Sequence, residues 1–355
     1  MNIEMSKNHN TAGEIRLRRA LLDTTPRGLY CEEGGFYIDP WAKVERAIVT
    51  HAHSDHVRYG CTHYLTAMSG VQVLRQRMGS TANITGLDWL APLDIQGVKV
   101  SLHPAGHILG SAQIRVEYKG EVWVVSGDYK TEADATCKPF EVVQCHTFVT
   151  ESTFALPVYH WKPQIEIFRE INEWWQQNRE NGRTSVLFAY SLGKSQRLLA
   201  GIDSGIGPIA VHDSIHQFIQ PYRDEGIALP IVLHGDDTGT KIVRGCGLVI
   251  APQSTLNTDW LNRFGPLATA SASGWMQVRK TRNGRLAQRG FVLSDHADWQ
   301  GLLSAINATG AEHVAVTHGY VAPLVRYLNE CGIHARPLAT PYGGEQTDVE
   351  GGLDL

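Results

Sequence analysis

The sequence has little of what builds disulfide-linked, redox or membrane-spanning proteins. It holds six cysteines in 355 residues, and no two of them form a C-x-x-C pair. A disulfide framework, a zinc ribbon and a thioredoxin-like site are therefore not indicated. No apolar run reaches the length of about 18 residues that a membrane helix needs. Residues 1–13 are polar and lack the apolar stretch of a signal peptide, so we expect a cytoplasmic protein that does not enter a membrane.

Charge is modest and unevenly distributed. The net charge is −4, which taken alone argues weakly against a nucleic-acid partner. Residues 158–290, however, hold 15 Lys and Arg against 11 Asp and Glu. The basic run that begins with Arg279, Lys280 and Arg282 contains no acidic residue. This run is either a solvated surface or, as we predict for these three residues, a contact to substrate phosphates.

Hydrophobic patterning predicts an α/β protein of two units. Strand-like runs separated by turns fill the chain up to Glu151, with a short helical pattern over 71–78. An amphipathic helix over 163–178 and a strand over 184–190 then open a second α/β pattern. We predict one discontinuous domain, formed by residues 14–157 and 291–355, and an inserted domain over 158–290.

The most informative motif follows the apolar run 47–50. His51, His53, Asp55 and His56 place three imidazoles and a carboxylate within six residues. Residues i and i+2 of an extended segment point the same way, so His51 and His53 can hold one ion together. If the chain then turns into a helix, Asp55 and His56 face a second ion. The alternative is a polar loop whose histidines are satisfied within the protein.

Several later segments add residues of the same chemistry. His107 lies among small residues, and Asp128 follows a buried apolar strand. Glu151 and His318 also end apolar strands, whereas His296 precedes a helix-like run. Each of these taken alone would more often be structural.

In order and flanking sequence, these residues resemble a known superfamily. The series HxHxDH, His107 and Gly127-Asp128 is similar to the metal-ligand series of the metallo-β-lactamase superfamily. Glu151, His296 and His318, with their flanking residues, resemble the motifs of its β-CASP nuclease branch. The resemblance extends from residue 28 to about 340 and is strongest to bacterial DNA-ligase-associated exonucleases. It implies an αββα sandwich with an inserted α/β cap domain.

The resemblance also implies a site and a reaction. It assigns one Zn²⁺ to His51, His53 and His107, a second to Asp55, His56 and His318, and a bridging position to Asp128. Manganese is also compatible with such ligands. His296 would donate a proton to the leaving oxygen, and Glu151 would hold its ring. Asp39, which ends an earlier strand, would order the ligands from outside.

The expected activity is hydrolysis of phosphodiester bonds in DNA by an exonuclease, with a functional link to a DNA ligase and a helicase. A ribonuclease is the alternative, because RNA-cutting members of the branch carry histidine at the position of His318. A small-molecule hydrolase and a scaffold without activity are less compatible with the inserted unit and the complete ligand series.

The segment 191–195 offers a further contact to substrate. Ser191, Lys194 and Ser195 surround a glycine where a helix is expected to begin. Backbone N–H groups at a helix start favour phosphate, so we predict that these side chains bind the substrate backbone. A nucleotide-binding P-loop is excluded, because Phe188 occupies the place of its first glycine.

Overall fold

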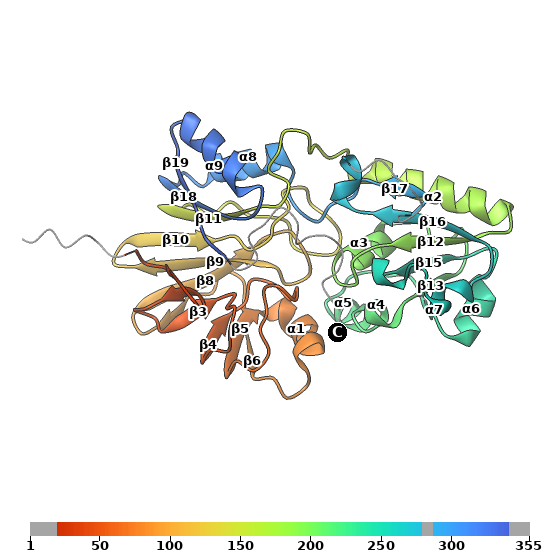
Figure 1. The fold of residues 1–355 in the computed structure, drawn as a ribbon. Coiled ribbons are helices and arrows are strands. Elements are labelled where there is room, and N and C mark those ends of the chain that lie inside the picture. Colours follow the sequence, from red (N-terminus) through yellow and green to blue (C-terminus); the bar gives the residue numbers. More distant parts are fainter. Residues whose placement is uncertain (1–19, 279–286, 341–355) are drawn as a thin grey trace, which may run out of the picture.

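A computed structural model describes residues 20–278 and 287–340. It contains three β-sheets with helices around them, which confirms the predicted mixed α/β class. Two of the sheets lie together in one half of the molecule, and the third forms the other half with its own helices (Figure 1).

The first sheet is formed by consecutive strands. Its order is β1-β2-β3-β4-β5-β6, antiparallel up to β3 and parallel from there. A short turn η1 (Met68–Gly70) and helix α1 (Val71–Met78) follow β5. The strands are β1 (Asp23–Thr25), β2 (Gly28–Cys31), β3 (Phe36–Ile38), β4 (Arg46–Ile48), β5 (His63–Ala67) and β6 (Ile84–Leu87).

The second sheet has the order β19-β18-β11-β10-β9-β8-β7. Apolar side chains of both sheets, such as Ile48 and Ile114, share one core between them, while helices α8 (Trp299–Ala308) and α9 (Val321–Glu330) cover the outer face. The strands are β7 (Leu93–Ile95), β8 (Val98–Pro104), β9 (Ala112–Tyr118), β10 (Glu121–Val125), β11 (Thr147–Ser152), β18 (His313–Gly319) and β19 (His334–Pro337).

The third sheet is parallel throughout and is covered on both faces. Its order is β14-β13-β15-β12-β16-β17. Parallel strands with helices on both faces lack a polar side, and the central strands are accordingly buried along their whole length. The strands are β12 (Thr184–Phe188), β13 (Ile209–Val211), β14 (Leu233–His234), β15 (Leu248–Ala251), β16 (Leu267–Ala272) and β17 (Arg289–Phe291).

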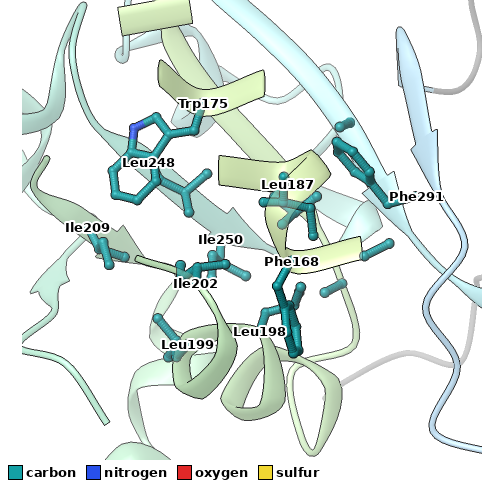
Figure 2. Packing of buried hydrophobic residues seen from close by; sticks show 14 of the residues in the cluster. Phe168, Trp175, Leu187, Leu198, Leu199, Ile202, Ile209, Leu248, Ile250 and Phe291 are labelled. Atoms are coloured by element: carbon teal, nitrogen blue, oxygen red, sulfur yellow. The ribbon is translucent and has the colours of Figure 1, made fainter. Parts of the chain in front are cut away.

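Helices of the third-sheet unit enclose two separate cores. On one face, Phe168 and Trp175 of α2 pack with Leu198 of α3 and Leu187 of β12 (Figure 2). On the other face, α6 and α7 pack against the sheet through Val243 and other apolar residues. The elements are α2 (Gln164–Glu180), α3 (Lys194–Gly201), α4 (Asp213–His216), α5 (Ile219–Asp224), α6 (Asp237–Val243), α7 (Asp259–Asn262), η2 (Gln253–Thr255) and η3 (Gly274–Gln277).

The chain path brings distant motifs together. Strand β11 ends at Ser152, and the chain then forms the third-sheet unit before it returns to the second sheet. There β18 pairs in parallel with β11, so that Thr150 is opposite Val316 and Ser152 is opposite Gly319. Because parallel strands end at the same edge of a sheet, Glu151 and His318 reach one edge although the third sheet separates them in sequence.

Most predicted elements are present, with shifted ends. The expected strand over 184–190 ends at Phe188, and the expected helix over 163–178 is α2. The chain does not turn into a helix after His53, because residues 54–56 form a turn. Among the described residues, no helix is long and apolar enough to cross a membrane.

Candidate metal centre

The HxHxDH segment lies at the end of β4, at the edge where the two facing sheets meet the third-sheet unit. His51 and His56 are buried, His53 is half-buried and Asp55 is exposed. The turn is closed by a hydrogen bond from the His56 amide to the His53 carbonyl, 3.1 Å. Asp55 and His56 belong to a different group of possible metal ligands from His53.

A first cluster consists of His51, His53, His107 and Asp128. One ligand atom from each lies within 4.8 Å of the others. Nδ1 of His53 is 3.1 Å from Nε2 of His51 and 3.1 Å from Nε2 of His107. Oδ2 of Asp128 is 3.4 Å from the same His51 nitrogen and 3.7 Å from that of His107. Three nitrogens and one carboxylate oxygen thus converge on one point.

A second cluster lies on the other side of Asp128. Asp55, His56 and His318 again place one ligand atom each within 4.8 Å of the others. Nε2 of His56 is 3.5 Å from Oδ2 of Asp55 and 3.5 Å from Oδ1 of Asp128. The two Asp128 oxygens therefore face different clusters. This is the position that a carboxylate bridging two cations requires.

Four imidazoles contact a partner on the side of the ring that faces away from the clusters. This partner determines which ring nitrogen faces the cluster. Nδ1 of His107 donates to the carbonyl oxygen of Asp295, 2.8 Å. Nε2 of His53 donates to the carbonyl oxygen of Leu192, 3.1 Å. Outer hydrogen bonds of this kind orient metal-binding imidazoles. Two further contacts join His51 Nδ1 to Thr50 Oγ1 and His56 Nδ1 to Asp39 Oδ2, at 3.1 and 2.7 Å.

Asp39 is bound tightly to the start of the HxHxDH segment. Its carboxylate accepts hydrogen bonds from the Thr50 amide at 2.8 Å and from the Thr50 hydroxyl at 2.6 Å. It also contacts His56, as described above. These contacts place Asp39 behind the clusters, where our sequence-based interpretation expected it, but its role in holding a metal remains a prediction.

His318 adopts a backbone conformation that L-residues rarely take. Its φ is 49° and the following Gly319 has a φ of 79°. A Cβ at Gly319 would lie 2.4 Å from the carbonyl oxygen of Ser152, so only glycine fits beside β11. Strained backbone of this kind persists where the surroundings hold it, often at functional sites. Here it turns the His318 ring towards His56, with which it stacks at 5.3 Å between centroids.

Glu151 and His296 form a pair next to the first cluster. Nδ1 of His296 lies 2.9 Å from Oε2 of Glu151, and the His296 and His107 ring centroids are 4.7 Å apart. Glu151 is itself fixed by the Tyr129 amide at 2.8 Å. Burial lowers the pKa of His296, but the charge of Glu151 and its hydrogen bond outweigh this and raise the pKa to about 9. The raised pKa favours the charged form of the ring, in which Nε2 also carries a proton.

The chain is similar in sequence to several known proteins. No family model matches the chain. The chain is 30% identical over 341 residues to a probable DNA ligase of Opitutus terrae, an alignment that covers 92% of this chain and 31% of that protein. It is 26% identical over 122 residues to endoribonuclease YSH1 of Saccharomyces cerevisiae, covering 34% and 15% respectively. An RNase J-like protein of Methanocaldococcus jannaschii is 25% identical over 186 residues, covering 46% and 44%.

The chain is a relative of the metallo-β-lactamase/β-CASP nucleases. It spans less than half the length of each of these three relatives. A crystal structure of a protein of unknown function from Enterococcus faecalis matches 84% of this chain and 80% of its own with a TM-score of 0.58. At 12% identity this likeness shows the fold alone.

The ionisation of the first cluster in this β-CASP relative suits a divalent cation. Burial and the other imidazoles lower the pKa of His51 well below its usual value and that of His53 to about 3. Burial alone would raise the pKa of Asp128, but the neighbouring histidines, His56 foremost, lower it. Neutral imidazole and ionised carboxylate are the forms that bind metal, so the residues of the first cluster fit one.

His56 differs from the histidines of the first cluster. Burial lowers its pKa, but the charges of Asp128, Asp55 and Asp39 outweigh burial and raise the pKa well above 6.5. A protonated ring here balances these carboxylates. That proton must leave before His56 can bind a cation. The acidic surroundings that hold the proton would equally attract a divalent cation in its place.

The predicted substrate contacts in segment 191–195 have partners inside the protein. Lys194 is 4% exposed, and its Nζ lies 3.5 Å from Oδ2 of Asp295. The Ser195 hydroxyl donates to the Tyr190 carbonyl at 2.6 Å, and the Ser191 hydroxyl lies 2.8 Å from that of Ser214. These side chains are buried, so we do not retain them as phosphate contacts. The other predicted contacts, Arg279, Lys280 and Arg282, lie outside the described residues.

Residues that our sequence interpretation did not assign hold the site from behind. Arg197 of α3 lies 3.1 Å from Oδ1 of Asp295 and 3.5 Å from Oδ2 of Asp134, all three being shielded from solvent. Arg197 also donates to the carbonyl oxygen of Ser294. No local motif marks an arginine in an ordinary helix, and only the fold brings it to the segment that carries His296.

Proposed function

We propose that this chain is a metal-dependent DNA exonuclease that hydrolyses phosphodiester bonds. The observation that supports this most is the position of Asp128, whose two oxygens face two clusters, with the Glu151–His296 pair beside them. His51, His53 and His107 would hold one divalent cation, and Asp55, His56 and His318 a second, with Asp128 shared. Imidazole and carboxylate ligands favour Zn²⁺, and Mn²⁺ is compatible.

Two cations held in this way would supply Lewis-acid stabilisation of phosphate oxygens and lower the pKa of water towards neutrality. The chain's own residues provide the rest. The nitrogen of His296 that does not face Glu151 would transfer its proton to the departing sugar oxygen. Glu151 holds the ring orientation and stabilises the imidazolium until the transfer. After hydrolysis, His296 would take up a proton from water.

The third-sheet unit would act as the inserted cap domain, with boundaries near 158 and 290. In this arrangement the facing sheets form the αββα sandwich, in two segments over 14–157 and 291–355. The clusters lie where the sandwich meets this unit, because Leu192 of the unit contacts His53. A strand of nucleic acid would therefore bind between the two parts.

A DNA substrate is supported by the relative of Opitutus terrae, a probable DNA ligase that aligns with almost the whole chain. On this basis we propose a cytoplasmic role in DNA repair or end processing, in association with a ligase and a helicase. A ribonuclease is the second candidate. It is favoured by histidine at position 318 and by the similarity to the endoribonuclease YSH1 and the RNase J-like protein.

Digestion of end-labelled substrates tests this proposal. Protein reconstituted with zinc or manganese would be incubated with single-stranded DNA, duplex DNA and RNA of one sequence. Stepwise shortening of DNA, absent with Asp128→Ala, is the expected result, and it would also give the direction of attack. Preferential cutting of RNA would establish the second candidate, and no cutting of any polymer would overturn the phosphodiesterase assignment.

A further inference from the structure

Five aromatic side chains pack together next to His296. Phe154 and Tyr159 are buried and form the floor of this group. Trp161, Trp275 and Tyr320 surround the floor and are each partly exposed. Phe154 lies 4.8 Å from Trp275 and 5.0 Å from Trp161, while Trp275 and Tyr320 are 6.3 Å apart, all between centroids. We call these five residues the aromatic cluster.

The aromatic cluster is joined directly to the proposed proton donor. The Trp161 indole donates from Nε1 to the backbone carbonyl of His296 at 2.9 Å. The Phe154 ring lies 5.9 Å from the His296 ring, whose other neighbour is His107 at 4.7 Å. His296 therefore contacts both the first metal cluster and the aromatic cluster.

The local backbone places Trp275 firmly against this floor. Gly274 opens the turn η3, and a Cβ at this position would come within 2.6 Å of the Phe154 ring. Glycine thus permits the close approach of η3 to Phe154. The Ser273 hydroxyl accepts a hydrogen bond from the Trp275 amide at 3.3 Å and caps the same turn. The Trp275 ring is therefore held in place before any ligand arrives.

Structural packing alone does not explain why three aromatic rings at this position are partly exposed. Burial of a large aromatic ring removes roughly 150–250 Å² from water, so a purely structural cluster would gain from covering them. These three rings instead come from three separate segments and remain partly open to solvent. Every nucleobase has a face that stacks on aromatic side chains, irrespective of sequence. Rings held ready beside a phosphodiester-cleaving centre match that use.

We propose that Trp275, with Trp161 and Tyr320, forms a stacking platform for a nucleobase of the substrate strand. The nucleotide in question is the one that carries the leaving oxygen, because its proposed proton donor His296 contacts the aromatic cluster through its ring and its backbone carbonyl. This inference rests on the proposed function and extends it by a base-binding subsite. It also implies a preference for unpaired substrate ends, since a base inside a duplex cannot stack on protein.

Single abasic residues moved along a single-stranded substrate test the platform. With the metal-loaded protein, one abasic position on the leaving side should lower kcat/KM by roughly five-fold to one-hundred-fold, the range of base–aromatic stacking. Trp275→Ala should cause a similar loss on the intact strand and make that abasic position neutral. Trp275→Phe should restore most of the activity. Tyr327→Ala, an exposed ring that packs on Trp299, is the matched control.

Binding without cleavage separates this inference from the proposed function. Asp128→Ala protein, which we expect not to cut, would be titrated against the same labelled strands by fluorescence anisotropy. If Trp275→Ala in that background removes the difference between intact and abasic strands, the platform is supported even where no cleavage occurs. If Trp275→Ala weakens intact and abasic strands by the same factor, or leaves both unchanged, the platform is wrong.

Discussion

Nε2 of His53 lies 3.1 Å from the carbonyl oxygen of Leu192, a residue of the third-sheet unit. His107 has a corresponding partner in the carbonyl oxygen of Asp295, on the segment that returns from that unit. Two imidazoles of the first cluster are thus oriented by backbone groups that lie in the third-sheet unit or directly after it. The packing of the third-sheet unit against the two facing sheets and the geometry of the first cluster are therefore coupled.

Removal of Arg197 should weaken the packing between the third-sheet unit and the segment that carries Asp295. The guanidinium is buried between Asp295 and Asp134, and a buried charge left without its partner is costly. We expect Arg197→Ala to lower the free energy of unfolding by about 3–5 kcal/mol and to weaken zinc binding through the displaced Asp295 carbonyl. Urea unfolding and competition with a zinc chelator measure the two effects. Arg263→Ala, which removes the exposed pair with Asp237 and a hydrogen bond to the Gly235 carbonyl, should cost less, about 1–2 kcal/mol. Equal losses in both variants would contradict this account.

Gly193 should not tolerate a side chain. Its φ is 90°, and a Cβ would lie 2.2 Å from Cγ2 of Ile108 and 3.9 Å from Nε2 of His53. Gly193→Ala combines backbone strain with a steric clash, so we expect a loss of roughly 2–4 kcal/mol in the free energy of unfolding. Gly226→Ala is the matched control, because its φ is 80° but nothing lies within 4 Å of its Cβ position. If both variants lose the same stability, the contact with Ile108 is not the cause.

The sequence predicts the residues that could bind a cation better than it predicts the residues that orient them. His51, His53, Asp55 and His56 are close in sequence, so their spacing alone indicates a cation site. The grouping with His107, Asp128 and His318 is predicted by resemblance, and the parallel pairing of β11 with β18 gives its physical basis. Arg197 and the Leu192 carbonyl have no such signal, because their contacts exist only after two units of the chain have packed.

The prediction for residues 191–195 shows where a local pattern misleads. Gly193 and Lys194 do lie at the start of helix α3, as the pattern indicated. Lys194 nevertheless faces Asp295 inside the protein instead of an outside phosphate. Burial alone would raise the pKa of Asp295, but Lys194 and Arg197 outweigh it and lower that pKa. A sequence reveals that a lysine opens a helix, but not which side of the helix a second unit will cover.

His296 should be needed for turnover but not for metal binding. Its Nδ1 is taken by Glu151, and its proposed task is proton donation. We expect His296→Ala to lower kcat by roughly 10²–10⁴-fold, the usual contribution of a general acid. Elemental analysis should show that its metal content is the same as in the wild type. His53→Ala should lose metal as well as activity. A His296→Ala protein with full turnover would show that another group protonates the leaving oxygen.

The His296–Glu151 pair also predicts how the metal-free protein responds to pH. The pKa of His296 is raised to about 9 from a usual value of 6.5. A raised folded-state pKa stabilises the protein fully below pH 6.5, and this stabilisation is lost as the pH rises through 9.

In chelator-treated protein, we expect the His296 ring resonances to titrate near pH 9 and to shift towards 6.5 in Glu151→Gln. The difference in the free energy of unfolding between wild type and Glu151→Gln should be largest near pH 6. Its pH-dependent part should be no more than about 3 kcal/mol. It should shrink towards pH 10, and a difference that stays constant over this range would mean that Glu151 does not hold a proton on His296.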